Sequence, residues 1–171
     1  MPLRGPPGFP APVVSVVGRS GVGKTLVMER LIKEFKGRGR RVAAVKHAAH
    51  GFQLDRPGTD SWRLVQAGAP LVILTSPGQA AVLESMAGEP DLEALAARYL
   101  AGVDLVLVEG YKDKPFSKIE VWWSRVGGAL LCQGPELMAL VCDRPFDVKV
   151  PQFAFEDTVS LANFLEKQLS A

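Results

Sequence analysis

The sequence predicts an α/β fold with three layers, in which helices cover both faces of a mostly parallel sheet and an antiparallel hairpin extends it. Two observations predict this class. Apolar runs of strand length alternate with segments whose apolar residues repeat at helical spacing. A glycine-rich turn joins the first apolar run to the first helical segment, an order typical of parallel sheets whose functional loops meet at the carboxyl ends of the strands.

Each expected strand is a short apolar run bounded by turn residues, and each expected helix has a glycine after it or a capping residue before it. In chain order, the expected strands are residues 13–17, 42–45, 71–74, 80–84, 103–108, 119–123, 129–132 and 137–142. The expected helices are residues 26–35, 59–67, 91–100 and 157–169.

The boundaries of these elements carry specific signals. Glycines or capping residues mark the helix ends, at Gly37, Gly68, Asp91 and Asp157 or Thr158. Ser76-Pro77-Gly78 closes the strand at 71–74 and lets residues 80–84 pair with it. Gly127-Gly128 predicts a tight turn between residues 119–123 and 129–132, which would make these two segments an antiparallel hairpin.

Length and composition limit the class of protein. With 171 residues, of which 47% are hydrophobic, residues 13–171 are expected to form a single domain. Residues 1–12 contain five prolines and two glycines and are expected to be a flexible lead-in. A net charge of +2 argues against nucleic acid or a membrane surface as a partner. Two cysteines, no signal-peptide pattern and no apolar run near about 18 residues predict a cytoplasmic protein.

Residues 18–25 carry the pattern G-x-x-x-x-G-K-[ST] between an expected strand and an expected helix, the context in which this pattern forms a phosphate-binding loop. Its residues are Gly18, Arg19, Ser20, Gly21, Val22, Gly23, Lys24 and Thr25. The glycines let successive backbone N–H groups point at a triphosphate. Lys24 is expected to act as a catalytic residue on the outer phosphates, and the Thr25 hydroxyl to ligate Mg²⁺. The alternative is a glycine turn that only caps a helix.

A carboxylate follows the strand expected at 103–108. Glu109 emerges at the carboxyl end of this strand, where a second group on the Mg²⁺ side is needed, so it is the predicted catalytic and metal-side residue. Asp104 lies at the opposite end and is expected to cap the strand. The alternative for Glu109 is a solvated side chain beside Gly110.

Polar residues are also concentrated after the strand at 42–45. The predicted substrate-binding residues are Lys46, His47, His50, Asp55 and Asp60, with Lys112 bordering the same cleft. Contact with an anionic substrate, a solvated loop, and a metal site are the three alternatives for the histidines. Two histidines alone are fewer than the three or four protein ligands that zinc sites normally have.

These segments together resemble the MobB family, the molybdopterin-guanine dinucleotide biosynthesis protein B family of P-loop GTP-binding proteins. The resemblance rests on the loop at 18–25, Lys46-His47 through His50, the stretch from Asp55 to Trp62, the turn at 67–69 and residues 107–112. It implies GTP and Mg²⁺ as ligands, slow hydrolysis and homodimerisation. It also implies assistance to a MobA-type guanylyltransferase that converts the molybdopterin cofactor to its guanine dinucleotide form.

Guanine recognition has no N-K-x-D motif behind it, since the single asparagine is Asn163. Asp143 follows the strand at 137–142 and could accept hydrogen bonds from guanine N1 and N2, or it could simply form a turn before Arg144-Pro145. Arg19 could reach the nucleotide of a partner subunit, or only raise the local positive potential.

Two other functions remain open at the level of sequence. One is a P-loop small-molecule kinase or ATP-dependent synthetase, in which Asp55 or Asp60 would be the base. The other is a module that holds nucleotide and cofactor for a partner without significant turnover.

Overall fold

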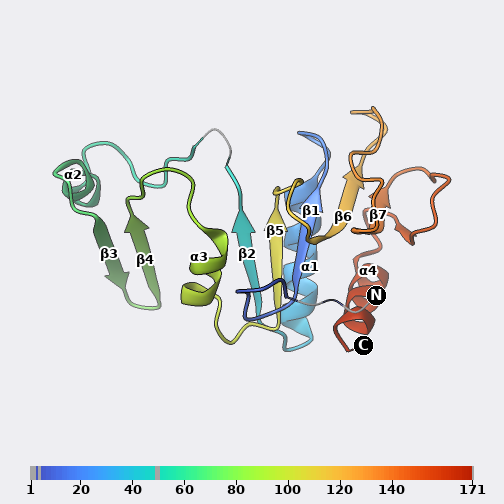
Figure 1. The fold of residues 1–171 in the computed structure, drawn as a ribbon, viewed down its shortest axis with the longest axis horizontal. Coiled ribbons are helices and arrows are strands. Elements are labelled where there is room, and N and C mark those ends of the chain that lie inside the picture. The colour runs from blue at the N-terminus through green and yellow to red at the C-terminus, as the bar shows by residue number, and fades with distance from the viewer. Residues whose placement is uncertain (1–2, 4, 49–50, 171) are drawn as a thin grey trace. The chain divides into compact units, whose positions relative to one another are not determined.

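The computed structural model describes residues 3, 5–48 and 51–170. Six strands form one sheet in the order β2-β5-β1-β6-β7-β8, and every neighbouring pair is parallel (Figure 1). The strands are β1 (Val13–Val17), β2 (Val42–Lys46), β5 (Leu105–Glu109), β6 (Ser117–Trp122), β7 (Leu137–Cys142) and β8 (Gln152–Phe153). The prediction of a mostly parallel sheet is therefore confirmed, and β8 is a strand that the sequence did not predict.

Helices α1 (Lys24–Gly37) and α4 (Thr158–Leu169) share one hydrophobic core with the sheet. Leu31 and Phe35 of α1 are fully buried in this core, as are Leu107 of β5 and Leu165 of α4. Alternate residues of each strand face the same side of a sheet, so one face of β1, β5, β6 and β7 packs against the two helices. This packing places the first turn of α1 directly beyond the end of β1.

The second face of the sheet carries buried polar side chains. Ser15, Lys118 and Glu120 are all buried, and they lie on β1 and β6. The Glu120 carboxylate accepts hydrogen bonds from the backbone N–H groups of Leu131 and Cys132, at 2.7 and 2.9 Å. The segment between β6 and β7 is thus held over this face by a buried carboxylate.

The expected hairpin at residues 119–123 and 129–132 is wrong. Residues 129–132 are not a strand, and β6 pairs in parallel with both β1 and β7. A parallel neighbour requires the chain to return to the opposite end of the sheet, so residues 123–136 form a crossover and not a tight turn. The bonds to Glu120 replace the ladder that a hairpin would have provided.

The antiparallel pair lies elsewhere in the chain. Strands β3 (Leu71–Ser76) and β4 (Gln79–Glu84) form a separate two-stranded sheet, as the turn at Ser76-Pro77-Gly78 predicted. They belong with α2 (Asp60–Gln66) to one of two compact units of the chain, residues 48–92. The other unit comprises residues 1–47 and 93–171, and α3 (Leu92–Tyr99) begins at its boundary.

Several local contacts lie within the unit of residues 1–47 and 93–171. Asp104 lies just before β5, at the end away from Glu109, and its carboxylate accepts a hydrogen bond from the backbone N–H of Arg41, the residue before β2, at 2.7 Å. Asp157 is the N-cap of α4 and accepts from the backbone N–H of Ser160. Leu3 is buried, and its N–H donates to the carbonyl of Gln168. The division into a lead-in over 1–12 and a single domain over 13–171 stays a prediction.

Both cysteines are free and buried, as a small apolar role requires. Burial, and after it the negative charge of Glu120, raises the pKa of the Cys132 thiol to about 11, and burial raises the pKa of Cys142. Both thiols are therefore protonated at neutral pH. Across residues 3, 5–48 and 51–170, none of the helices has the length and apolar character to cross a bilayer.

Glu120→Ala should lower the free energy of unfolding by about 1–3 kcal/mol, because the change leaves the buried N–H of Cys132 without an acceptor and also removes the partly buried bond from Leu131. Glu120→Gln, which keeps one carbonyl acceptor, should fall between this variant and the wild type. Urea denaturation measures the differences. Glu29→Ala, at an exposed position of α1, is the matched control, and an equal small loss in Glu120→Ala would contradict the role of Glu120.

Candidate functional site

The loop between β1 and α1 is shaped by a close approach of two backbones. Gly18 has a φ of 145°, and a Cβ built on it would collide with the carbonyl oxygen of Val121 on β6. Glycine is therefore required there. Gly23, with a φ of 94°, precedes the first residue of α1, and within the described chain no side chain caps this helix start. The first N–H groups of α1 are thereby left for an anion.

Lys24 folds back over the loop that precedes it. Its Nζ donates to the carbonyl oxygens of Gly18 at 3.1 Å and Arg19 at 3.0 Å. These two bonds hold the ammonium group above the loop, where the phosphates of a nucleotide would meet it. The same bonds brace the curvature of the loop, so Lys24 has both a local structural role and a suitable position for binding phosphate.

Glu109 joins the loop to the end of β5. The Thr25 hydroxyl donates to Oε2 of Glu109 at 2.9 Å, and the Lys46 Nζ lies 3.6 Å from Oε1 of the same carboxylate. The Glu109 side chain is 15% exposed and that of Lys46 is 65% exposed. The structure thus brings together three predicted site residues from three different segments.

The pair formed by Thr25 and Glu109 fits Mg²⁺. This cation prefers oxygen ligands, and it commonly takes one or two from the protein while water and phosphate supply the others. A hydroxyl and a carboxylate within hydrogen-bond distance of each other match that requirement. In the described ranges, His, Cys, Asp and Glu form no group of three or more that could hold a metal, so a purely protein-built site is absent there.

The turn after Glu109 involves two residues whose roles sequence reasoning missed, one on β1 and one in the turn itself. Ser15 of β1 is fully buried, and its hydroxyl donates to the carbonyl of Gly110 at 2.5 Å. Tyr111 follows with a φ of 51°, a region that costs a non-glycine residue about 1–2 kcal/mol. Its ring stacks on His47 with centroids 4.4 Å apart. The sequence shows that Tyr111 follows closely after Glu109, but no sequence pattern predicts a positive φ for a tyrosine.

The polar loop that was predicted as one site falls into two parts. Lys46 and His47 lie at the end of β2 beside Glu109. Asp55 and Asp60 belong to the compact unit of residues 48–92. The prediction for His50 falls outside the described residues. Lys112 is exposed on the turn after β5.

Asp55 organises its own loop. Its carboxylate accepts from the backbone N–H of Arg56 and from the hydroxyl of Thr59, and Thr59 is the N-cap of α2. Hydrogen bonds from Ser61 and Thr59 lower the pKa of Asp55. The Asp60 side chain, by contrast, is 98% exposed, with Arg63 at 3.8 Å.

Arg19 lies against its own chain. A Cβ built on Gly128 would be 2.5 Å from Nε of Arg19, so the guanidinium crosses the glycine turn after β6. Burial raises the pKa of Glu120, while the N–H groups of Leu131 and Cys132 and the charge of Arg19 oppose that rise. Arg19 therefore lies against the glycine turn of the crossover segment, and its charge favours the ionised form of Glu120 on β6.

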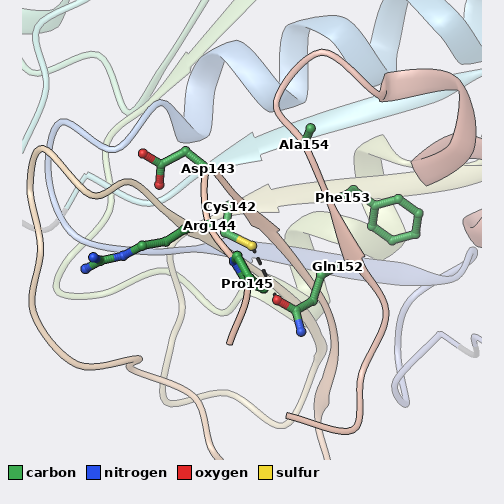
Figure 2. Close-up of a pocket in the computed structure, with 7 residues that line it drawn as sticks. All are labelled: Cys142, Asp143, Arg144, Pro145, Gln152, Phe153 and Ala154. Carbon is green, nitrogen blue, oxygen red and sulfur yellow. Dashed lines mark hydrogen bonds between the residues drawn. The ribbon is translucent and has the colours of Figure 1, made fainter. Parts of the chain in front are cut away.

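Asp143 borders a pocket of about 360 Å³ at the carboxyl ends of β7 and β8 (Figure 2). The pocket is lined by Cys142, Asp143, Arg144, Pro145, Gln152, Phe153 and Ala154. The Asp143 carboxylate accepts from the backbone N–H of Ser124 at 2.9 Å and from the Ser124 hydroxyl. These bonds, with the hydroxyl first, lower the pKa of Asp143, so the carboxylate is a charged acceptor at neutral pH.

A parallel sheet flanked by helices, a glycine-rich loop with Lys24 and Thr25, and Glu109 at the adjacent strand end define the class of P-loop nucleotide-binding proteins. Residues 13–143 match the family described as molybdopterin guanine dinucleotide synthesis protein B, MobB. The chain belongs to this family.

Individual relatives agree with this assignment. The molybdopterin-guanine dinucleotide biosynthesis adapter protein of Haemophilus influenzae is 32% identical over 159 residues, covering 92% of this chain and 89% of the relative. The protein of the same description from Escherichia coli K12 is 32% identical over 162 residues, covering 90% and 91%.

Solved structures agree with the fold. The crystal structure of a molybdopterin-guanine biosynthesis protein B (mobB) has a TM-score of 0.72 at 28% identity, covering 93% of this chain and 99% of that chain. Bacillus subtilis MobB has a TM-score of 0.73 at 23% identity, covering 92% and 97%, and supports the fold alone.

Lys24→Ala should weaken triphosphate binding by about ten- to a hundredfold, because a charge-assisted phosphate contact contributes roughly 1.5–3 kcal/mol. The fold should persist, since the side chain bonds only to loop carbonyls. Titration with a labelled nucleotide measures the affinity, and circular dichroism measures the fold. Lys33→Ala removes the same charge from an exposed position of α1 and should bind normally. Wild-type affinity in Lys24→Ala would contradict the assignment of the loop.

Proposed function

We propose that this chain binds GTP with Mg²⁺, hydrolyses it slowly, and acts as an adapter in the formation of molybdopterin guanine dinucleotide. In this role it would assist a MobA-type guanylyltransferase in the cytoplasm. The observation that supports it best is the hydrogen bond between Thr25 of the phosphate loop and Glu109 at the end of β5. Membership of the MobB family supplies the pathway.

The phosphate loop and Glu109 have separate tasks in this proposal. The backbone N–H groups of residues 18–25 and the Lys24 ammonium bind the phosphates, since both are positively polarised and the ammonium is held against the loop by Gly18 and Arg19. Thr25 and Glu109 hold Mg²⁺, which would supply neutralising charge to the outer phosphates. Glu109 orients the water that attacks, and its carboxylate can accept a proton from that water.

The guanine would lie in the pocket beside Asp143. A carboxylate that stays charged can accept the N1 and N2 hydrogens of guanine, whereas adenine presents a different edge. Ser124 already donates two hydrogen bonds to this carboxylate and would hold it in place. Each carboxylate has about four lone-pair sites, so acceptor capacity remains for the base.

The remaining predicted residues would serve the pterin cofactor. A pterin ring presents N–H donors, for which the exposed carboxylate of Asp60 is a suitable acceptor. Its phosphate would attract Lys46, Lys112 and the two histidines His47 and His50. Asp55 would act by shaping this loop through Thr59.

A kinase or synthetase that uses Asp55 as its base is disfavoured. The hydrogen bonds from Ser61 and Thr59 lower the pKa of this carboxyl group, and a lower pKa makes a weaker base. An efficient general base has a pKa near the working pH.

Calorimetric titration of GTP and ATP in Mg²⁺ should show preferred binding of GTP, and single-turnover assays should show slow hydrolysis. Glu109→Gln should reduce the hydrolysis rate at least tenfold, because an amide neither neutralises Mg²⁺ nor accepts a proton from water. GTP affinity without Mg²⁺ should stay within about threefold. Glu29→Gln on α1 is the matched control.

The adapter role is tested by adding the guanylyltransferase and molybdopterin to the same assays. The wild-type chain should increase formation of the guanine dinucleotide. Failure of the wild type to bind either nucleotide would refute the proposal, and normal hydrolysis by Glu109→Gln would return that residue to a structural role.

A homodimer is part of the proposal, and the strands β3 and β4 are its candidate interface. One face of this two-stranded sheet exposes Leu71, Ile73 and Val82, with Ile73 and Val82 in register. An isolated pair of strands is marginally stable in water, and a contiguous apolar face commonly marks an interface. A second copy of the same face could cover it.

Ile73→Lys should raise the dissociation constant of the homodimer at least tenfold, because a two-fold interface would bury the new charge twice. Sedimentation velocity over a concentration series measures the shift. Gln66→Lys adds the same charge at an exposed position of α2 and should leave the dimer intact. A dimer of unchanged affinity in Ile73→Lys would exclude this face.

A further inference from the structure

Tyr111 adopts a backbone conformation that its residue type disfavours. Among the described residues it is the one non-glycine residue with a positive φ, 51°, and it follows Gly110 at 98°. Bulky side chains are rare in this region, and such strain persists where the surrounding structure over-determines the backbone. The strained turn comes directly after Glu109, the predicted catalytic carboxylate.

Three hydrogen bonds hold the backbone of this turn. The buried hydroxyl of Ser15 donates to the carbonyl of Gly110 at 2.5 Å, and the N–H of Gly110 donates to the carbonyl of Val16 at 3.3 Å. The N–H of Lys114 donates to the carbonyl of Tyr111 at 3.1 Å. The turn is therefore tied both to β1 and to the segment that leads into β6.

Stacking of two aromatic rings further restrains the turn at Tyr111. Tyr111 and His47 are stacked, with centroids 4.4 Å apart and planes inclined by 24°. The N–H of His47 donates to the carbonyl of Glu109 at 3.0 Å, and a Cβ built on Gly110 would lie 3.2 Å from the Cβ of His47. The ends of β2 and β5 are thus in direct contact through these two residues.

Two charged residues, Lys46 and Glu109, lie next to the contact between His47 and Tyr111. Lys46 and Glu109 are register partners on β2 and β5, and their side chains form an ion pair at 3.6 Å. Glu109 also accepts the hydroxyl of Thr25. A rotation of the turn at Tyr111 would therefore move the carboxylate relative to both partners.

We propose that Tyr111 is a positioning residue whose ring, stacked on His47, holds the turn that aims Glu109 at Thr25. Through the same stack, a change at Glu109 is passed to His47 at the end of β2. This inference rests on the proposed function, because it assigns to Glu109 the binding of Mg²⁺ beside a nucleotide.

Tyr111→Leu removes the ring, and Tyr111→Phe keeps it. In Tyr111→Leu the affinity for GTP in EDTA should stay within twofold, since Lys24 and the loop are untouched. The Mg²⁺ concentration for half-maximal single-turnover hydrolysis should rise about tenfold, and Tyr111→Phe should restore it to within twofold. Tyr99→Leu on α3 is the matched control, and it should leave both values unchanged. His47→Leu removes the other ring without touching the strained backbone, so it should reproduce the Mg²⁺ effect even where Tyr111→Leu folds poorly.

A second readout does not depend on hydrolysis. The chain has two histidines, so His47→Leu assigns the two imidazole signals in a proton–carbon NMR spectrum. Titration with Mg²⁺ alone, at constant ionic strength, should shift the His47 signal in the wild type. The shift should disappear in Glu109→Gln, which loses the charge, and in Tyr111→Leu, which loses the stack.

Three outcomes would overturn the inference: an unchanged Mg²⁺ dependence in folded Tyr111→Leu, a Tyr111→Phe variant as defective as Tyr111→Leu, or a His47 signal that ignores Mg²⁺. Failure of the proposed function looks different. In that case the wild type binds no GTP by calorimetry, and the Mg²⁺ titration of the His47 signal still decides whether Glu109 and the stack are coupled.

Discussion

The parallel pairing of β1 with β5 on one side and β6 on the other is the constraint on which the rest of the structure depends. It places Val16 opposite Glu109 and Val17 opposite Glu120, so that the chain leaving β1 emerges between two strand ends. The carbonyl of Val121 then leaves room only for a glycine at position 18. The phosphate loop, the carboxylate beside it and the turn after that carboxylate all follow from this one arrangement.

The same arrangement explains why β6 buries two charged side chains. The Nζ of Lys118 donates to the carbonyl of Lys114 at 2.7 Å and lies 3.8 Å from the Glu136 carboxylate. Glu120 accepts two backbone N–H groups of the crossover segment. Buried charges are costly unless such partners are present. Here the partners come from segments without regular structure, so the two side chains hold those segments against the sheet.

The sequence predicted those features of the fold and the site that depend on residues close together in the chain. The strand at 13–17, the loop at 18–25 and the carboxylate at Glu109 follow from apolar runs and one motif, and the structure brings Thr25 and Glu109 together across 84 positions. The hairpin at 119–132 was wrong because Gly127-Gly128 is also a local signal, whereas the partners of β6 are set by long-range pairing with β1 and β7. Turn residues report a change of direction but not which strand comes next.

The site residues divide along the same line. His47 was predicted from its place after a strand, yet its stacking on Tyr111 depends on the register of β2 against β5, which no spacing within either segment reveals. Asp143 stayed ambiguous because a turn and a base contact ask for the same residue type, and its bonds to Ser124 are compatible with both. Residue type therefore predicted which side chains belong to the candidate site, but it did not predict which of them contact each other.

The two parts of the polar loop are held by different contacts. Lys46 and His47 are tied to Glu109 by an ion pair, a backbone hydrogen bond and the register of two strands. Asp55 is tied instead to Thr59 and the start of α2, within residues 48–92. A charge that changes at Glu109 therefore acts directly on Lys46 and His47, whereas Asp55 and the start of α2 are held by their own hydrogen bonds. The two parts of the polar loop therefore have independent local support, because Lys46 and His47 bond to Glu109 whereas Asp55 bonds within its own turn.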